Sequence, residues 1–186
     1  MKVYQKPGPE NTEETIRLAV ERAIAMDHAP IVTATTRGGS SVKLCEIAKD
    51  MGFKGKIVVV THAYGFSKNG ENSLKDEIRA QLVSYGAIMV TAAHVLSGAE
   101  RGISNKFQGA YPVEIMAHTL RVLSQGVKVA VEIATMALDN GAIPYGIPIV
   151  CMGGTGGGVD TAVIMSPAHA NKIFETNIHE ILCMPY

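Results

Sequence analysis

The segment from residue 31 to residue 48 constrains the fold of this chain more than any other. A β-branched run, IVTAT, passes through a short polar loop, TRGGS, directly into the start of an amphipathic pattern, SVKLCEIA. A strand that leads into a helix through so short a loop is typical of α/β proteins, in which such loops lie at the carboxyl ends of the strands. Ligands of open α/β sheets bind at those ends, so this junction is also the first candidate for a binding site.

The residues of this loop are of the kinds that bind a phosphate. They are Thr35, Thr36, Arg37, Gly38, Gly39, Ser40 and Ser41. Hydroxyls and a guanidinium donate hydrogen bonds, and glycine lets backbone N–H groups approach an anion at the positive end of a helix. The spacing has no GK[ST] and no GxGxxG, which excludes a Walker A loop and a dinucleotide fingerprint. The alternative is an ordinary turn into a helix capped by serine.

Charge and cysteine content narrow the class of protein. The chain has 186 residues with 17 basic and 17 acidic side chains, so its zero net charge argues against nucleic acid or an anionic membrane as the partner. Cys45, Cys151 and Cys183 have no CxxC spacing and lie in apolar runs, which predicts reduced core thiols. With neither a secretory h-region nor a long apolar span, we expect one soluble, cytoplasmic domain over residues 1–186 that binds a small molecule.

Apolar periodicity predicts alternating helices and strands. Asn11 and Glu14 suggest a capping box, and Ser73 suggests a second cap. The expected helices cover residues 12–27, 41–51, 74–85, 112–126 and 127–140, and the expected strands cover 31–35, 57–61, 88–91, 147–152, 161–165 and about 180–184.

This alternation predicts the architecture. Strands that alternate with helices pair in parallel through right-handed crossovers, which indicates a three-layer α/β/α sandwich with a mostly parallel sheet. The short 153–160 connection instead predicts an antiparallel hairpin at one edge of the sheet. Polar or Gly-rich loops follow four strands, and the loops from about 62 to 73 and from 94 to 109 are longer than connections require, which favours a function for them.

Three titratable residues stand out near the expected strand ends. His62 and His94 follow two strands by one to three residues, so both imidazoles should face one mouth as acid/base groups or ligand contacts. The alternative is two histidines hydrogen-bonded within loop turns, and without a third ligand we expect no metal. Glu132 lies in the apolar run VAVEIATMAL, where a carboxylate must pair or reach solvent. Lys128 one turn earlier is the simplest partner, and the pattern leaves open whether Glu132 belongs to the site.

The order of these segments resembles the C-terminal domain of pyruvate kinase over nearly the whole chain. It is closer still to small stand-alone prokaryotic proteins built of that domain alone, as IVTATTRGGSSVKLCEIA and IPIVCMGGTGGGVDTAVIM indicate. In pyruvate kinase the domain carries an allosteric sugar-bisphosphate site, whose phosphate loop corresponds to residues 35–40. A Gly-rich hairpin before a Thr-Asn pair corresponds to Gly156, Gly157, Gly158, Asp160 and Thr161, with Ala162 in place of the Asn. Nothing resembles the catalytic barrel, so kinase activity is not implied.

For the stand-alone proteins the resemblance implies flavin mononucleotide (FMN) as the ligand. We therefore expect an FMN-binding protein that holds the phosphate on the 35–41 loop. Its reaction is unknown, and oxidoreduction is one candidate. The ring would lie between the loops at 62–66, 94–101 and 153–158, which adds as contacts Tyr64, Gly65, Ser97, Gly98, Gly153, Gly154 and Thr155. The alternative is a non-catalytic domain that senses a sugar phosphate. Whether the chain is an enzyme stays open, and homo-oligomers are a general expectation.

Overall fold

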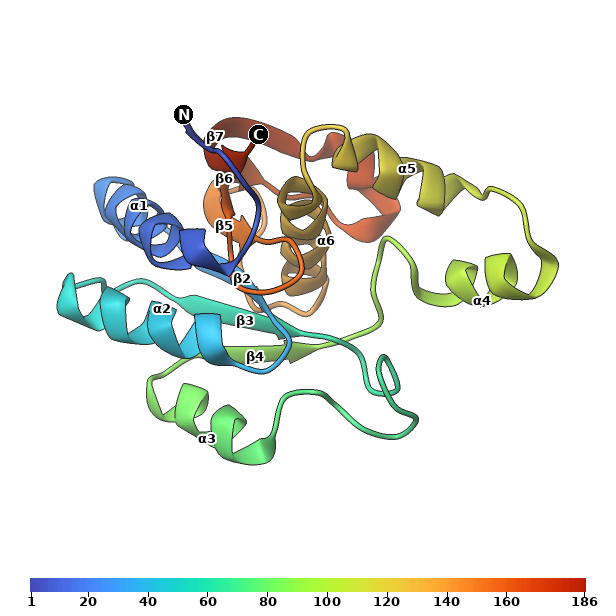
Figure 1. The fold of residues 1–186 in the computed structure, drawn as a ribbon. Coiled ribbons are helices and arrows are strands. Elements are labelled where there is room, and N and C mark those ends of the chain that lie inside the picture. Colours follow the sequence, from blue (N-terminus) through green and yellow to red (C-terminus); the bar gives the residue numbers. More distant parts are fainter.

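The chain forms one seven-stranded sheet with helices on both faces, in a computed structural model that describes residues 1–186 (Figure 1). The strands are β1 (Lys2–Tyr4), β2 (Ile31–Thr35), β3 (Ile57–Thr61), β4 (Ile88–Thr91), β5 (Ile149–Gly153), β6 (Thr161–Ser166) and β7 (Asn177–Pro185). The helices are α1 (Thr12–Ala25), α2 (Gly39–Asp50), α3 (Asp76–Ser84), α4 (Gly98–Phe107), α5 (Pro112–Arg121) and α6 (Gln125–Asp139), with 3-10 segments η1 (Pro9–Asn11) and η2 (Ala170–Glu175).

The strand order is β1-β7-β6-β5-β2-β3-β4. Only β6 runs against the others, because it pairs antiparallel with both β5 and β7 while the remaining neighbours pair in parallel. The mostly parallel sheet and the hairpin over the 153–160 connection are therefore confirmed, and β7 and β1 extend the sheet beyond that hairpin. Because β2, β3, β4 and β5 point the same way, the loops after them meet at one edge of the sheet.

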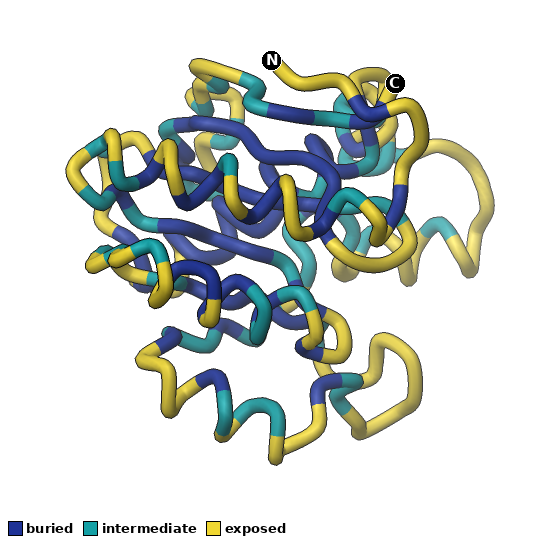
Figure 2. Tube along the Cα trace, turned by 60° about the vertical axis from the view of Figure 1, so that its left-hand side comes forward, coloured by how far each residue is buried: buried dark blue, intermediate teal, exposed yellow.

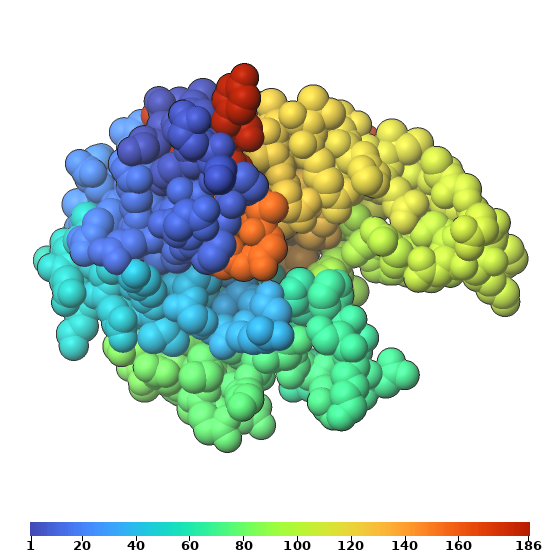
Figure 3. Space-filling view, viewed as in Figure 1, coloured from blue at the N-terminus to red at the C-terminus, as the bar shows by residue number.

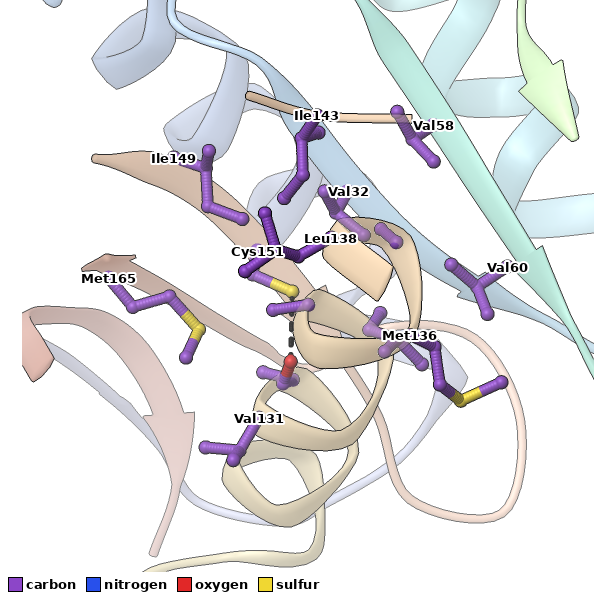
Figure 4. Packing of buried hydrophobic residues seen from close by; sticks show 14 of the residues in the cluster. Val32, Val58, Val60, Val131, Met136, Leu138, Ile143, Ile149, Cys151 and Met165 are labelled. Carbon is purple, nitrogen blue, oxygen red and sulfur yellow. Dashed lines mark hydrogen bonds between the residues drawn. The ribbon is translucent and has the colours of Figure 1, made fainter. Parts of the chain in front are cut away.

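Two apolar layers hold the sandwich together. One joins α1 and α2 to the sheet through residues such as Ile16, Leu44 and Val150, and the other lies under α6. Figure 4 shows this second layer, in which the Cys151 thiol donates to the Ala130 carbonyl at 3.2 Å. Figure 2 shows buried strands at the centre of the molecule and exposed residues on the outer helices and loops. The predicted α/β/α arrangement is confirmed.

Helix α6 is buried along almost its whole length, which fits its apolar sequence. Ser124 caps it, since the Ser124 hydroxyl accepts a hydrogen bond from the Val127 N–H at 3.0 Å. None of the helices is both long and apolar enough to span a bilayer. The helix thus forms a rigid wall against which loops from the sheet edge can pack.

The three cysteines are free and buried, as predicted. Burial raises the pKa of the Cys45 thiol to about 11 and also raises the pKa values of Cys151 and Cys183. These thiols stay protonated at neutral pH and are poor nucleophiles.

The expected capping box before α1 is wrong. Asn11 has helical dihedral angles and donates its side-chain amide to the Lys6 carbonyl, because a 3-10 turn already leads into the helix. The cap expected at Ser73 is also wrong: α3 begins at Asp76, and the Ser73 hydroxyl contacts the Ser67 hydroxyl at 3.0 Å. In both places the side chain forms its hydrogen bond within the segment that precedes the helix.

The 94–109 segment contains α4, where the sequence predicted only a loop. None of its residues is buried, so the apolar periodicity that marks a core-facing helix is nearly absent. Ile103 and Phe107, four residues apart, were the one signal, and both are exposed. Strand β1, η1 and η2 were not predicted, β5 begins two residues later than expected, and β7 is longer at both ends.

Candidate functional site

A cavity of about 560 Å³ lies at the carboxyl ends of β2, β3 and β5. It is bounded by the loop after β2, the start of the loop after β3, the hairpin after β5 and one side of α6. Its lining residues are Ala34, Thr35, Thr36, Arg37, Gly38, Gly39, Ser40, Val60, Thr61, His62, Phe66, His94, Gln125, Val129, Glu132, Ile133, Met136, Gly154, Gly156, Gly157 and Gly158. All six predicted residues from 35 to 40 and both histidines are among them. Ser41 is buried and lies outside the lining.

The loop after β2 places backbone donors at the start of α2. Gly38 is the N-cap, with φ +95°, and no side chain caps this helix, which excludes the serine-capped alternative. The Gly38 N–H bonds to the Thr35 hydroxyl at 3.1 Å, and the first helical bond runs from the Val42 N–H to the Gly38 carbonyl at 2.9 Å. The N–H groups of Gly39 and Ser40 precede that bond and have no acceptor within the helix. Such a group of donors can bind an anion.

The hairpin after β5 brings bare backbone to the opposite side of the cavity. Gly156 and Gly157 have φ +69° and +150°, and nothing lies within 4 Å of where a Cβ would stand on either. Thr161 and Asp160 are buried behind the hairpin, where Asp160 accepts the Thr161 hydroxyl at 3.0 Å and the Gly8 N–H at 3.1 Å. Of the predicted hairpin residues, Gly154, Gly156, Gly157 and Gly158 line the cavity, and Gly153, Thr155, Asp160 and Thr161 do not.

His62 and His94 form a hydrogen-bonded chain with Thr36. The Thr36 hydroxyl lies 3.2 Å from His62 Nε2, and His62 Nδ1 lies 3.1 Å from His94 Nε2. The Phe66 ring is parallel to the His62 ring, with centroids 3.9 Å apart. The prediction that both imidazoles face one mouth is confirmed. The hydrogen bonds also link them to the loop at the start of α2.

Burial and mutual repulsion favour the neutral form of this pair. Desolvation lowers the pKa of His62, and the neighbouring His94 lowers it further. Desolvation also lowers the pKa of His94, against an opposing attraction from Glu132. A neutral imidazole can accept a proton, so the pair can act as a base at neutral pH.

Glu132 is at once in the site and paired with Lys128. Both side chains are buried on α6, where they form an ion pair. The second oxygen of Glu132 accepts the Leu96 N–H at 2.9 Å and so ties the segment that carries His94 to α6. The sequence left open whether Glu132 belongs to the site or only pairs with Lys128. Both are the case, because Glu132 also lines the cavity.

Several lining residues were not predicted, and four predicted residues from the loops after β3 and β4 lie outside the lining, in addition to those of the hairpin. Tyr64 and Gly65 are exposed and outside the lining, while Ser97 and Gly98 line a neighbouring cavity. The unpredicted group comes mainly from one side of α6 and consists of Gln125, Val129, Ile133 and Met136, next to Glu132, whose place the sequence left open. Their spacing of three or four residues was visible in the sequence, but a run that is apolar almost throughout gave no sign of which face would lie beside a ligand.

Comparison with known families agrees with this geometry. The model of the pyruvate kinase alpha/beta domain family matches residues 13–165. The chain belongs to the pyruvate kinase alpha/beta domain family. The matched region of this pyruvate kinase alpha/beta domain includes every residue that lines the cavity.

Proposed function

We propose that this protein binds FMN in the cavity at the carboxyl ends of β2, β3 and β5. The observation that carries the proposal is the start of α2, where the N–H groups of Gly39 and Ser40 precede the first helical hydrogen bond. They are joined by the hydroxyls of Thr36 and Ser40 and by the exposed Arg37. Nothing lies within 4 Å of a Cβ built on Gly39, so a phosphate has room to approach the backbone there.

The remaining walls suit a flat, partly polar ring. Val129, Ile133 and Met136 supply an apolar surface from α6, while Phe66 and His62 present stacked rings near the mouth. The cavity volume of about 560 Å³ falls within the range of about 300 to 1,000 Å³ typical of small-molecule sites. The chemistry that FMN supplies when bound is electron transfer, and this chain's part would be to hold it and to accept or return a proton at the neutral imidazoles.

A sugar phosphate is the alternative, because the C-terminal domain of pyruvate kinase, which the sequence resembles, carries a sugar-bisphosphate site. The charges in the lining favour a ligand with one phosphate over a bisphosphate. Arg37 is the only Lys or Arg in the lining, and the Glu132 carboxylate, already paired with Lys128, would repel a second phosphate near α6. FMN carries one phosphate and satisfies this condition, as does a sugar monophosphate.

Calorimetric titration with FMN and riboflavin tests the proposal. FMN should bind about ten- to a hundredfold more tightly, because only FMN has the phosphate that can engage these donors. Arg37→Ala should reduce the affinity for FMN and leave that for riboflavin nearly unchanged. Arg79→Ala is the matched control, since Arg79 lies on α3 and does not line the cavity.

Equal affinity for the two flavins would contradict the role given to the start of α2. If neither flavin binds, the FMN proposal is wrong, and titration with ribose 5-phosphate then tests the sugar-phosphate alternative. In that case Arg37→Ala should still weaken binding, because both ligands share the phosphate.

A further inference from the structure

A second cavity of about 530 Å³ adjoins the first and shares two of its walls, His94 and Met136. It lies where the segment after β4, the starts of α4 and α5 and the end of α6 meet. Its other lining residues are Ala92, Ala93, Val95, Ser97, Gly98, Ala99, Glu100, Val113, Asp139 and Asn140. Figure 3 shows this side of the molecule, where the arm that contains α4 stands away from the body. The proposed FMN site uses only His94 and Met136 of this group.

Half of the lining is apolar and most of its side chains are small. Ala92, Ala93 and Ala99 leave room for a ligand, while Val113 and Met136 offer larger apolar surfaces. A cavity with this lining fits a compact ring or a short branched chain. It does not fit a large polar molecule, because few hydrogen-bonding groups face it.

The charges of this lining are of one sign. Glu100 and Asp139 are its only charged side chains, and no Lys or Arg is among its residues. Glu100 accepts the Glu114 N–H at 2.9 Å with one carboxylate oxygen and keeps the other available. Asp139 is the last residue of α6, where the negative end of the helix dipole adds to the charge of its carboxylate.

The partners of Asp139 do not cancel its charge when they are neutral. His169 Nδ1 lies 2.6 Å from one oxygen, and the Ala170 N–H donates to the other at 3.2 Å. The first cavity has the opposite charge at the start of α2, where Arg37 and the backbone N–H donors lie.

We propose that the second cavity binds a small organic amine. Its ammonium group lies between Glu100 and Asp139, and its apolar part packs against Ala92, Val113 and Met136. Such a ligand would contact His94 and Met136, the two side chains that this cavity shares with the proposed FMN site. The amine site does not depend on what occupies the first cavity.

Three probes of one shape separate charge from size: benzylamine, benzyl alcohol and benzoate, each added at pH 8 to the isotope-labelled full chain without FMN. Amide shifts of residues 92–100 and 136–140, followed by NMR, should report binding of benzylamine. Its affinity should exceed that of benzyl alcohol by about five- to tenfold, and benzoate should bind least. Benzyl alcohol or benzoate binding as tightly as benzylamine would overturn the proposal, and so would no binding of benzylamine.

Variants locate the site. Glu100→Gln keeps an acceptor for the Glu114 N–H, and Asp139→Asn keeps one for the Ala170 N–H while its amide NH2 can donate to His169 Nδ1, so the fold should survive. Each variant should weaken benzylamine about two- to fivefold without changing benzyl alcohol. Ala99→Leu, on an exposed helical position, should fill the cavity and remove both probes. Glu77→Gln on α3 is the charge control and should change nothing. Benzylamine affinity that all these variants leave unchanged would overturn the assignment.

Discussion

The loops after β2 and β5 are both rich in glycine and face the same cavity, yet their glycines have different surroundings. In the first loop only Gly38 is sterically required, since a Cβ there would stand 2.2 Å from Ile78 Cγ2. In the second, Gly154 and Gly158 are required, with backbone or side-chain atoms at 2.3 Å and 2.2 Å. The glycines at the open positions are Gly39, Gly156 and Gly157, which have nothing within 4 Å.

This contrast separates glycines that serve the fold from those free to serve a ligand. In the hairpin the packed glycines, Gly154 and Gly158, lie on either side of the open ones, Gly156 and Gly157, and all four line the cavity. The first loop adds side-chain donors to its open glycine, since Arg37 and Ser40 flank it. The second offers mainly backbone, which suits a wall that closes over a ligand more than a site that fixes a charge.

The largest expected effect is the loss of stability on Gly153→Ala. A Cβ at this position would stand 2.2 Å from the Gly126 carbonyl oxygen, so β5 and α6 would have to move apart. We expect a loss of about 2 to 3 kcal/mol in the free energy of unfolding, measured by urea denaturation. Gly39→Ala, the same substitution at an open position of the other loop, should stay within about 0.5 kcal/mol. Equal effects of the two variants would erase the distinction between packed and open glycines.

A smaller effect is expected from Gly157→Val at the open part of the hairpin. Space is available for the side chain, but φ +150° strains any residue with a Cβ. The strain should lower the free energy of unfolding by about 1 to 2 kcal/mol, less whatever the exposed turn relieves by relaxing. Affinity for FMN should fall about tenfold, because the side chain enters the cavity and alters the backbone that faces the ligand. Calorimetry and thermal unfolding give the two readouts.

Gly156→Asn is the matched control for that variant. Asparagine tolerates the left-handed region in which Gly156 lies at φ +69°, so its effect on stability should be slight. If Gly157→Val lowers thermal stability and leaves FMN affinity unchanged, the hairpin is only a turn and has no part in binding.

Most of the frame of the site could be predicted from the sequence. Alternation of strands and helices predicted which loops share an edge, and that in turn predicted that His62 and His94 face one mouth, where they contact each other. These predictions succeeded because parallel strands bring their carboxyl ends together whatever the side chains are. The position of a residue after a strand was therefore enough.

Other features depend on packing that a linear pattern does not encode. Asp160 and Thr161 follow a glycine-rich run, but they turn inward to bond with each other and with Gly8, which is distant in the sequence. Strand β1 pairs with β7 at the far end of the chain, and a three-residue strand has no periodicity to detect. Which glycines are open is likewise decided by neighbours such as Ile78, which lie outside the loop.

The smallest expected effect distinguishes the two loops by pH. Desolvation and mutual repulsion lower the pKa of His62, and desolvation lowers that of His94, so the unfolded chain takes up protons first, near the ordinary value of 6.5. The stability due to the neutral pair is present above that pH and is lost as the pH falls through the lower folded values. Because Thr36 bonds to His62, the loop after β2 should open more readily at pH 5.5 than at pH 7.5, whereas no hydrogen bond joins the hairpin to the pair.

Native-state hydrogen exchange, corrected for intrinsic rates, measures this difference. The Gly38 amide should exchange faster at pH 5.5 than at pH 7.5, because protonation of the pair removes part of the stability that protects it. The Val159 amide, which bonds to the Thr12 hydroxyl at 3.2 Å behind the hairpin, should not change. The variant with His62→Gln and His94→Gln should lose the pH response of Gly38. If both amides respond equally, protonation of the pair acts on the whole domain, and the two loops do not behave independently. If the response of Gly38 survives in the variant, protonation of the pair is not its cause.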